Sequence, residues 1–193
     1  MSRETSSLYF KSVGCSMILT ETKLKGVYIL EPQVFGDARG WFMETYNKKK
    51  TPQITCSFVQ DNQSYSAAKG TLRGIHFQRP PMAQAKLIRC TRGALMDFAI
   101  DLRPKSETYK QWVSVELTEE NKKQIFIPRG FGHAFITLAD DTEVQYKADN
   151  YYSPDHDSAI LWSDPEIGID WGNEDPIVSD KDKIAPLLKE VQL

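Results

Sequence analysis

Short apolar runs separated by turn residues characterise the chain from about residue 24 onward. These runs are rich in β-branched and aromatic residues, which favour strands. They lie at residues 26–30, 57–60, 87–91, 94–102, 112–117, 124–128, 133–138 and 143–148. Turn signals such as Lys69-Gly70, Arg92-Gly93 and Pro128-Arg129-Gly130 separate them. Because no amphipathic stretch of about ten residues occurs between the strands, the pattern predicts an all-β antiparallel sandwich or barrel.

Alternation within the strands defines two faces without saying which one points inward. In residues 94–102, the side chains of Met96, Phe98, Ile100 and Leu102 share one face. Asp97 and Asp101 lie on the opposite face. A polar residue on an inward face is costly unless it is satisfied, so such positions in a barrel often line a ligand cavity.

Helix is predicted only in short segments, mainly near the C-terminus. Residues 178–190 hold the best helical turn, in which Ser179 and Asp182 match an S-x-x-D capping pattern. Pro186 limits how far this helix can continue. The domain organisation expected from these patterns is an extension at residues 1–16 followed by a single domain at residues 17–193.

Composition narrows the functional classes. The 193 residues carry a net charge of −2, which argues against a general nucleic-acid binder. Three widely spaced cysteines without a C-x-x-C pattern suggest neither a disulfide framework nor a zinc site, so a cytoplasmic protein with reduced cysteines is expected. No apolar stretch approaches the roughly 20 residues that cross a bilayer, and no signal peptide is recognisable.

The three histidines admit three interpretations: metal ligand, core residue or catalytic base. A jelly-roll metal site usually takes two histidines two residues apart, but the residue two after His76 is Gln78. His133 lacks an adjacent carboxylate, and His156 lies in a loop, so no metal is expected. For a lone histidine in an apolar strand, a hydrogen-bonded core position is otherwise the usual outcome.

Other ionisable residues weaken that core interpretation. They lie in or beside apolar strands and comprise Arg73, Lys86, Asp97, His133 and Tyr146. Burying so many ionisable groups is costly without a function. A cavity lined by a base, a cation and a phenol suits proton transfer next to a carbonyl, because the cation can hold the resulting oxyanion.

An ordered series of motifs carries a family resemblance from about Met17 to the C-terminus. The motifs are FGDARGWFMETY, FVQDNQSYS, GTLRGIHFQ, QAKLIRCTRGALMDFAIDLR, IPRGFGHAF, VQYKADNYYSPDHDSAILWSDPEIGIDW and IVSDKD. In this order they resemble the dTDP-4-dehydrorhamnose 3,5-epimerases, cofactor-free sugar-nucleotide epimerases of the cupin superfamily. The resemblance implies a jelly-roll homodimer that epimerises dTDP-4-dehydro-6-deoxy-D-glucose at C3 and C5 without metal or redox cofactor.

The same resemblance implies a role for particular residues. His76 matches the family's base and Asp182 its carboxylate partner, while Tyr146 matches the acid on the far face of the sugar. Lys86 matches the lysine that stabilises the enolate oxygen at C4. Residues that match the substrate-binding positions are Arg39, Phe42 and Glu44 from the other subunit, together with Gln60, Asn62, Arg73, His133 and Tyr152.

Without the resemblance, simpler interpretations compete for each position. Asp182 could be only the third residue of the helix that Ser179 caps. Lys86 could be an exposed strand lysine, Tyr146 a rim or core aromatic, and Phe42 a core residue. Arg39 could be a turn residue, Tyr152 a surface aromatic, and His133 a hydrogen-bonded core residue.

Competing functions also remain at this point. Within the enzyme class they are a single-carbon epimerase and a 3,4-ketoisomerase. A non-catalytic jelly-roll that binds a sugar nucleotide would not need a base, a lysine and a phenol together. A metal-dependent cupin oxygenase is disfavoured by Gln78 and by the scarcity of histidines. Arg73 lies three residues before His76, so both can face one ligand only if the strand bends or ends near Gly74.

Overall fold

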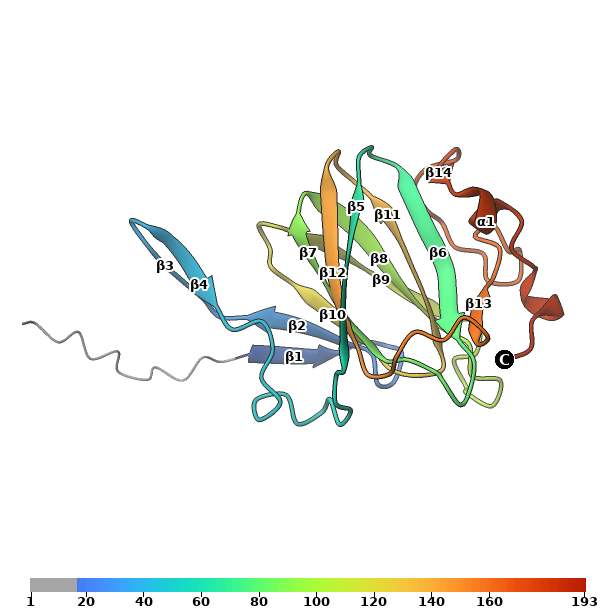
Figure 1. The fold of residues 1–193 in the computed structure, drawn as a ribbon, viewed down its shortest axis with the longest axis horizontal. Helices are drawn as coiled ribbons and strands as arrows, with labels where there is room; N and C mark the ends of the chain where they lie inside the picture. The colour runs from blue at the N-terminus through green and yellow to red at the C-terminus, as the bar shows by residue number, and fades with distance from the viewer. Residues whose placement is uncertain (1–16) are drawn as a thin grey trace, which may run out of the picture.

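The computed structural model describes residues 17–193 and is built from two facing β-sheets (Figure 1). The first sheet contains, in spatial order, β1 (Met17–Glu21), β2 (Tyr28–Pro32), β10 (Gln124–Ile127), β7 (Lys86–Arg92), β12 (Thr142–Ala148) and β5 (Gln60–Ser66). The second contains β13 (Asp157–Ala159), β6 (Thr71–Gln78), β11 (Phe131–Thr137), β8 (Ala94–Asp101) and β9 (Trp112–Thr118). Their pairings are antiparallel, whereas β14 (Ile177–Val178) runs parallel to β6. The expected jelly-roll of cupin type is confirmed.

Three apolar layers hold the sheets in place. The central layer lies between them and includes Ile88, Ala99 and Phe135. A second layer covers the outer face of β6, β11 and β8, where Phe98 packs against Trp171 of the C-terminal segment with ring centroids 4.7 Å apart. A third covers the outer face of the first sheet with residues of the segment between β4 and β5. Both faces of β8 are therefore buried, which places Asp97 in the interior and its apolar neighbours beneath the C-terminal segment.

Most of the strands expected from the apolar runs are present, with shifted ends. The run at residues 57–60 is the exception, because the strand there begins at Gln60 and continues to Ser66. Phe58 instead packs outside the sheet against Tyr46 and Phe126. The runs also did not include the short strands β1, β13 and β14 or the strands at residues 34–37 and 40–43, whose few residues give too little alternation to detect. They did not include the eight-residue β6 either, in which Arg73 and Gly74 interrupt the apolar positions.

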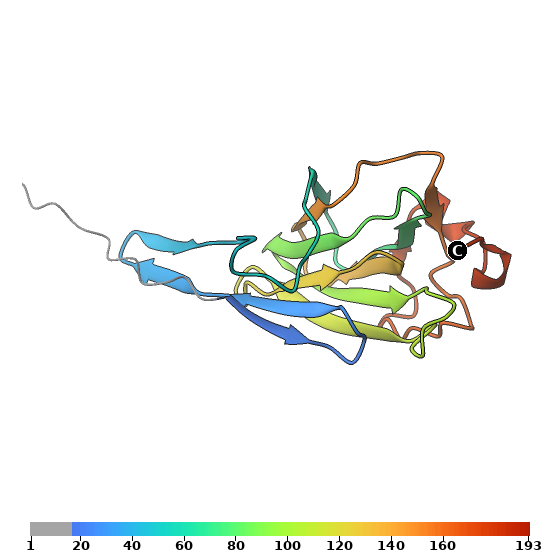
Figure 2. The ribbon, with the colours of Figure 1, turned by 90° about the horizontal axis from the view of Figure 1, so that it is seen from below.

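A separate hairpin of β3 (Val34–Asp37) and β4 (Gly40–Met43) extends away from the barrel (Figures 1 and 2). Its side chains include exposed aromatics, since Trp41 and Phe42 are 57% and 67% accessible. Lys122 of the β9–β10 turn lies over the Trp41 ring at 3.9 Å from its centroid. The hairpin thus presents apolar surface that the chain itself does not cover.

Helical structure is limited to α1 (Asp180–Lys183) and the 3-10 turn η1 (Leu188–Glu190) within the described residues. The capping pattern is confirmed, because Ser179 precedes α1 and its hydroxyl accepts from the Asp182 amide at 3.1 Å. Neither helix in residues 17–193 is long or apolar enough to cross a membrane. The expected N-terminal extension, residues 1–16, lies outside the described residues, as does Cys15.

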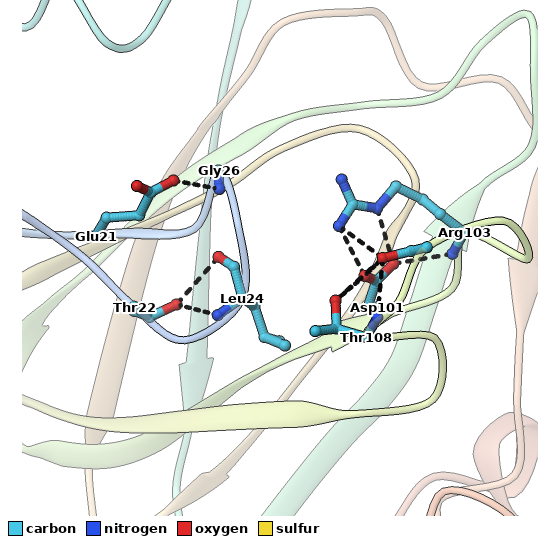
Figure 3. Close-up of polar contacts among 8 residues, drawn as sticks. Glu21, Thr22, Leu24, Gly26, Asp101, Arg103 and Thr108 are labelled. Atoms are coloured by element: carbon cyan, nitrogen blue, oxygen red, sulfur yellow. Dashed lines mark hydrogen bonds and ion pairs between the residues drawn. The ribbon is translucent and has the colours of Figure 1, made fainter.

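Hydrogen bonds from side chains stabilise two turns at one end of the barrel, and Figure 3 shows these contacts. In the β1–β2 turn, Glu21 accepts from the Gly26 amide at 2.8 Å. After β8, the buried Asp101 carboxylate accepts from the Arg103 guanidinium at 2.8 and 2.7 Å and from the Thr108 hydroxyl at 2.6 Å. Burial alone would raise the pKa of Asp101, but these hydrogen bonds, with one from Ser106, lower it to about 2.

Replacement of Asp101 by asparagine is expected to lower the free energy of unfolding by about 2 kcal/mol at pH 7. The ionised carboxylate is favoured in the folded state, so its contribution is complete above pH 4 and is lost as the pH falls toward 2. Urea denaturation at pH 7 and at pH 3 measures both values, and the difference between variant and wild type should shrink at pH 3. Asp37→Asn, which breaks the exposed Asp37–Arg39 pair, is the control and should change little. An equal loss of unfolding free energy in Asp101→Asn and Asp37→Asn would contradict the stabilising role assigned to the ionised Asp101.

Candidate active site

His76 and Asp182 form a hydrogen-bonded dyad although 106 residues separate them. The His76 Nε2 and Asp182 Oδ1 atoms lie 2.6 Å apart. His76 projects from β6, and Asp182 is a buried residue of α1. The backbone amide of Asp182 donates to the Ser179 hydroxyl at 3.1 Å, so the same residue serves the helix cap with its amide and His76 with its carboxylate.

The electrostatic setting of Asp182 decides which imidazole nitrogen is basic. Burial opposes its ionisation, but hydrogen bonds from His76, Ser179 and the Gly74 backbone outweigh burial and lower the pKa of Asp182. An ionised carboxylate can only accept, so the proton of the neutral imidazole resides on Nε2. The lone pair is then on Nδ1, which is the atom able to take a proton from a ligand.

A register shift at Gly74 brings Arg73 and His76 to one face of β6. His133 pairs with His76 and Phe135 pairs with Arg73, so three steps on β6 match two steps on β11. Such an extra residue forms a bulge. Gly74 has a φ of +136°, and a Cβ there would lie 2.3 Å from the Ala134 Cβ, so the close strand approach requires glycine. The strand therefore continues through the bulge instead of ending there.

Arg73, His76, Lys181 and Asp182 border a pocket of about 320 Å³. The Arg73 guanidinium donates to the Tyr65 carbonyl at 3.0 Å, which holds it beside the pocket. The dyad side chains are unequally exposed: His76 is 35% accessible and Asp182 only 4%. The imidazole is thus reachable by a ligand, while its carboxylate partner is shielded from water.

Lys86 and Tyr146 face the barrel interior from the opposite sheet. They lie on β7 and β12, where Tyr146 pairs with Ile88, a core residue two positions from Lys86. The Lys86 Nζ atom lies 5.7 Å from the centroid of the Tyr146 ring. Burial lowers the pKa of Lys86 to about 8, although the negative charges of Asp97 and Asp157 act to raise it. Burial, aided by Asp157, raises the pKa of Tyr146.

A second histidine–carboxylate pair lies beside the first. The buried His133 Nε2 is 2.9 Å from the Asp97 Oδ2 atom, and His133 pairs directly with His76 across β11 and β6. Burial lowers the pKa of His133 and raises the pKa of Asp97, and the attraction between the two groups opposes both shifts. Asp97 Oδ1 is buried and has no hydrogen-bond partner within residues 17–193.

Gln78, at the position where a second metal ligand would be expected, has a structural role. Its amide nitrogen donates to the Met82 and Tyr151 carbonyls at 2.6 and 3.1 Å, and its amide oxygen accepts from the Ser153 amide at 2.7 Å. These bonds anchor the loop that follows β12. Within residues 17–193, no group of three His, Cys, Asp or Glu side chains is arranged to hold a metal ion.

Gln60, Asn62 and Tyr152 form a polar rim on the side of Tyr146. Asn62 pairs directly with Tyr146, and Gln60 lies two residues away on the same face of β5. Gln60 accepts from the Tyr152 amide at 3.0 Å and donates to Asn62 at 3.0 Å. Tyr152 is 56% exposed. The structure therefore brings these three expected substrate-binding residues together.

Arg39, Phe42 and Glu44 are not brought to this site within one chain. Arg39 lies at the tip of the hairpin, where it pairs with Asp37 at 2.6 Å. Phe42 is exposed on β4, so it is not a core residue of this chain. Glu44 pairs with Lys50 at 3.0 Å. The hairpin that carries Arg39 and Phe42 points away from the barrel (Figure 2).

Two other groups near the site were not assigned a role from the sequence. Asp97 could be noticed, since it is a charged residue in an otherwise apolar strand. The ion pair between Lys181 and Asp157, 2.7 Å apart, carries no sequence signal because the partners lie in different elements 24 residues apart.

Comparison with known proteins agrees with this geometry. The family model described as dTDP-4-dehydrorhamnose 3,5-epimerase matches residues 21–190. The dTDP-4-dehydrorhamnose 3,5-epimerase of Salmonella typhimurium is 49% identical over 181 residues, which cover 92% of this chain and 98% of that protein. The Bacillus anthracis enzyme of the same name, crystallised with TDP and PPi bound, superposes with a TM-score of 0.86 at 52% identity, covering 89% of this chain and 99% of that chain.

A third comparison adds a sugar-nucleotide complex. The dTDP-6-deoxy-D-glucose-3,5-epimerase of Legionella pneumophila, in complex with dTDP-4-keto-L-rhamnose, has a TM-score of 0.87 at 40% identity and covers 91% of this chain and 95% of that chain. Similarity of this extent, over sequence and structure alike, shows common ancestry. The chain belongs to the dTDP-4-dehydrorhamnose 3,5-epimerase family.

Proposed function

We propose that this chain epimerises dTDP-4-dehydro-6-deoxy-D-glucose at C3 and C5 to give dTDP-4-dehydro-L-rhamnose. The observation that carries the proposal is the placement of His76 and Tyr146 on opposite sheets of one barrel. A sugar ring between the sheets would meet the imidazole on one face and the phenol on the other. Inversion of a carbon needs this arrangement, because the proton must leave from one face and return to the other.

His76 would act as the base. Its Nδ1 takes the proton from the carbon beside the C4 ketone, and the C–H electron pair forms the enolate double bond while the carbonyl electrons move to oxygen. The ionised Asp182 stabilises the imidazolium that results, because its carboxylate is held 2.6 Å from Nε2. The shielded position of Asp182 strengthens this interaction relative to one in water.

Lys86 would hold the negative charge that develops on the C4 oxygen. Its ammonium group extends from β7 into the barrel interior beside the Tyr146 ring. A cation placed in advance at a developing oxyanion is among the strongest contributions to catalysis, since it needs no reorganisation during the reaction.

Activity should fall above pH 8 because Lys86 loses its proton there. The pKa of about 8 places the cationic form in the majority at neutral pH, and kcat/KM should drop roughly tenfold per pH unit above it. Lys86→Arg keeps its positive charge at all these pH values, so the fall in kcat/KM should begin at a higher pH. The maximal kcat/KM should be lower than in the wild type, because a guanidinium differs in shape from an ammonium group. An unchanged alkaline limb in Lys86→Arg would assign the limb to another group.

Tyr146 would return a proton to the carbon from the far face. Its raised pKa keeps the phenol protonated at neutral pH, so the hydroxyl is ready to donate. Once the O–H proton has moved to carbon, the enolate electrons restore the ketone, and the phenolate regains a proton from solvent. The nearby Lys86 ammonium offsets the negative charge on the phenolate in the meantime.

The nucleotide would be bound by the polar rim and by a second copy of the chain. Arg73, Gln60, Asn62 and Tyr152 lie around the proposed sugar site, and His133 lies deeper in the barrel. The exposed hairpin supports a homodimer in which Arg39, Phe42 and Glu44 reach the partner's nucleotide, with arginine on phosphate and phenylalanine stacked on thymine. Cytoplasmic localisation and the absence of nucleic-acid partners stay predictions.

Incubation with dTDP-4-dehydro-6-deoxy-D-glucose in D2O tests the proposed reaction. NMR should show deuterium at both C3 and C5 together with the L-configured product. Label at one carbon alone would indicate a single-carbon epimerase, and a C3 ketone would indicate a 3,4-ketoisomerase. If the substrate binds and no carbon exchanges, the chain is a binding protein and the catalytic proposal fails.

A further inference from the structure

Arg129 and Asp149 form an ion pair that the proposed mechanism does not use. The Arg129 Nε atom lies 2.8 Å from the Asp149 Oδ2 atom, and the arginine side chain is half-exposed whereas the aspartate is buried. A second nitrogen of the same guanidinium donates to the Asp149 carbonyl at 3.4 Å. The arginine therefore holds both the side chain and the backbone of one buried aspartate.

Asp149 in turn fixes the residue that precedes Lys86. The Ala85 amide donates to the Asp149 Oδ1 atom at 2.6 Å, and the Asp149 amide donates to the Ala85 carbonyl at 3.1 Å. Lys86 is the first residue of β7 and pairs with Ala148, the last residue of β12. The aspartate thus joins the start of β7 to the end of β12, directly beside the lysine assigned to the C4 oxygen.

The backbone at this junction has a different environment on each side. Ala85 packs in the apolar layer outside the first sheet and, with Arg129 and Asp149, lines a pocket of about 530 Å³. Lys86 extends to the other side, into the barrel interior beside the Tyr146 ring. The chain between these two residues therefore separates an outer pocket from the buried ammonium group.

Loss of the Asp149 carboxylate would disturb this junction in a defined way. Ala85 is only 2% exposed, so its amide would lose its acceptor in a buried position. A buried amide without a partner costs free energy, which favours a shift of the chain toward water. Such a shift at Ala85 moves the neighbouring Lys86 and opens its surroundings to solvent.

We propose that Arg129 and Asp149 are positioning residues that fix the start of β7 and thereby hold the Lys86 ammonium group in the barrel interior. The pair acts through the Ala85 backbone and not on the sugar, and its catalytic consequence rests on the proposed function. A cation stabilises a developing oxyanion most when it is already in place, so displacement of Lys86 lowers the rate.

The groups that face the Lys86 ammonium come from four other strands. Asp97 of β8 and Asp157 of β13 attract its charge. His133 of β11 is close enough for that charge to help lower the pKa of the imidazole, and the Tyr146 ring of β12 lies 5.7 Å away. None of these groups is altered by substitution of the Arg129–Asp149 pair, so the pKa of Lys86 can report its position.

Asp149→Ala tests the proposal in the free protein, with Asp101→Ala as the matched control. Both carboxylates are buried, pair with an arginine and accept from a nearby backbone amide. Lysines labelled with ¹³C at Cε are titrated by NMR, and the signal missing from Lys86→Arg is that of Lys86. Removal of a negative charge alone would lower the pKa of Lys86, whereas contact with water would raise it.

In Asp149→Ala the pKa of Lys86 should rise from about 8 toward 10.5, the value of an unperturbed lysine, and in Asp101→Ala it should stay at about 8. Asp149→Asn keeps the volume of the side chain and serves if the alanine variant does not fold; it should shift the pKa in the same direction. A pKa that stays at about 8 or falls in the folded Asp149 variants would overturn the proposal. An equal rise in Asp101→Ala would overturn it too, by showing that any loss of a buried carboxylate loosens the barrel.

Kinetics give the second readout. Asp149→Ala should lower kcat about tenfold with KM unchanged, because the cation is displaced while the nucleotide contacts remain. Arg129→Lys keeps a cation beside Asp149 and should retain most of the rate. A rise in KM alone would contradict a positioning role, by showing that the pair contacts substrate. If the wild-type chain fails to exchange deuterium, the proposed function fails, but the titration of the free protein still decides whether Asp149 positions Lys86.

Discussion

Replacement of His76 by alanine is expected to reduce deuterium incorporation at C3 and C5 by on the order of 10³-fold. The reason is that no other group in the described residues combines the properties of a base at this place. His76 alone among the three histidines is both partly accessible and paired with a buried carboxylate of lowered pKa. Without the imidazole, the proposed site retains the Lys86 cation but has nothing to accept the proton.

The measurement is the same D2O experiment, run beside a titration with dTDP. Binding of dTDP should persist in His76→Ala, because the imidazole is assigned to the sugar carbons and not to the nucleotide. His156→Gln serves as the control, since this histidine bonds to the Ser153 hydroxyl at 2.8 Å within a loop. An active His76→Ala protein would refute the assignment of the base. Exchange lost at one carbon only would assign the second proton to another group, of which His133 is the nearest candidate.

Replacement of Tyr146 by phenylalanine is expected to separate exchange from inversion. The base and the cation remain, so a proton can still leave the carbon and solvent deuterium can return from the His76 side. The phenol that would donate on the opposite face is gone. Inverted product should therefore form on the order of 10²-fold more slowly, while deuterium continues to enter the unreacted substrate.

NMR of the recovered sugar distinguishes the two processes in one sample. Label in the starting configuration reports exchange, and label in the L-configured sugar reports inversion. The substitution removes only a hydroxyl, and the ring can still pack against Ile88 and Lys86, so the free energy of unfolding should change little. Equal loss of exchange and inversion would mean that Tyr146 supports binding or proton removal and is not the opposite-face acid.

Sequence motifs pointed to the candidate residues of the site but not to their surroundings. The fold class followed from short β-rich runs and intervening turns, and the family from the order of the motifs, because both depend on local sequence. The segment at 57–60 shows the limit: its apolar character led to a predicted strand, but Phe58 packs outside the sheet. Apolar side chains are compatible with either a strand or a covering loop, and only the neighbouring elements decide between them.

The assignment of faces shows the same limit in the candidate site. Alternation placed Asp97 and Phe98 on opposite faces of β8, but the sequence pattern does not indicate which of the two faces points into the barrel. The C-terminal segment, with Trp171, covers the Phe98 face, so Asp97 is left inside the barrel beside His133. A contact between residues so far apart in the chain could not be read from either strand alone.

By itself, the sequence determined the β-rich fold, the capping turn before Asp182 and the identity of His76, Lys86 and Tyr146 as candidates. The tertiary structure decided their relations. It placed His76 and Tyr146 on opposing sheets, brought Asp182 to His76 across 106 residues, and turned Arg73 to the face of His76 through the bulge at Gly74. The physical reason is that strand propensity, turns and caps are local, whereas strand pairing and the covering of each sheet face depend on contacts between distant segments.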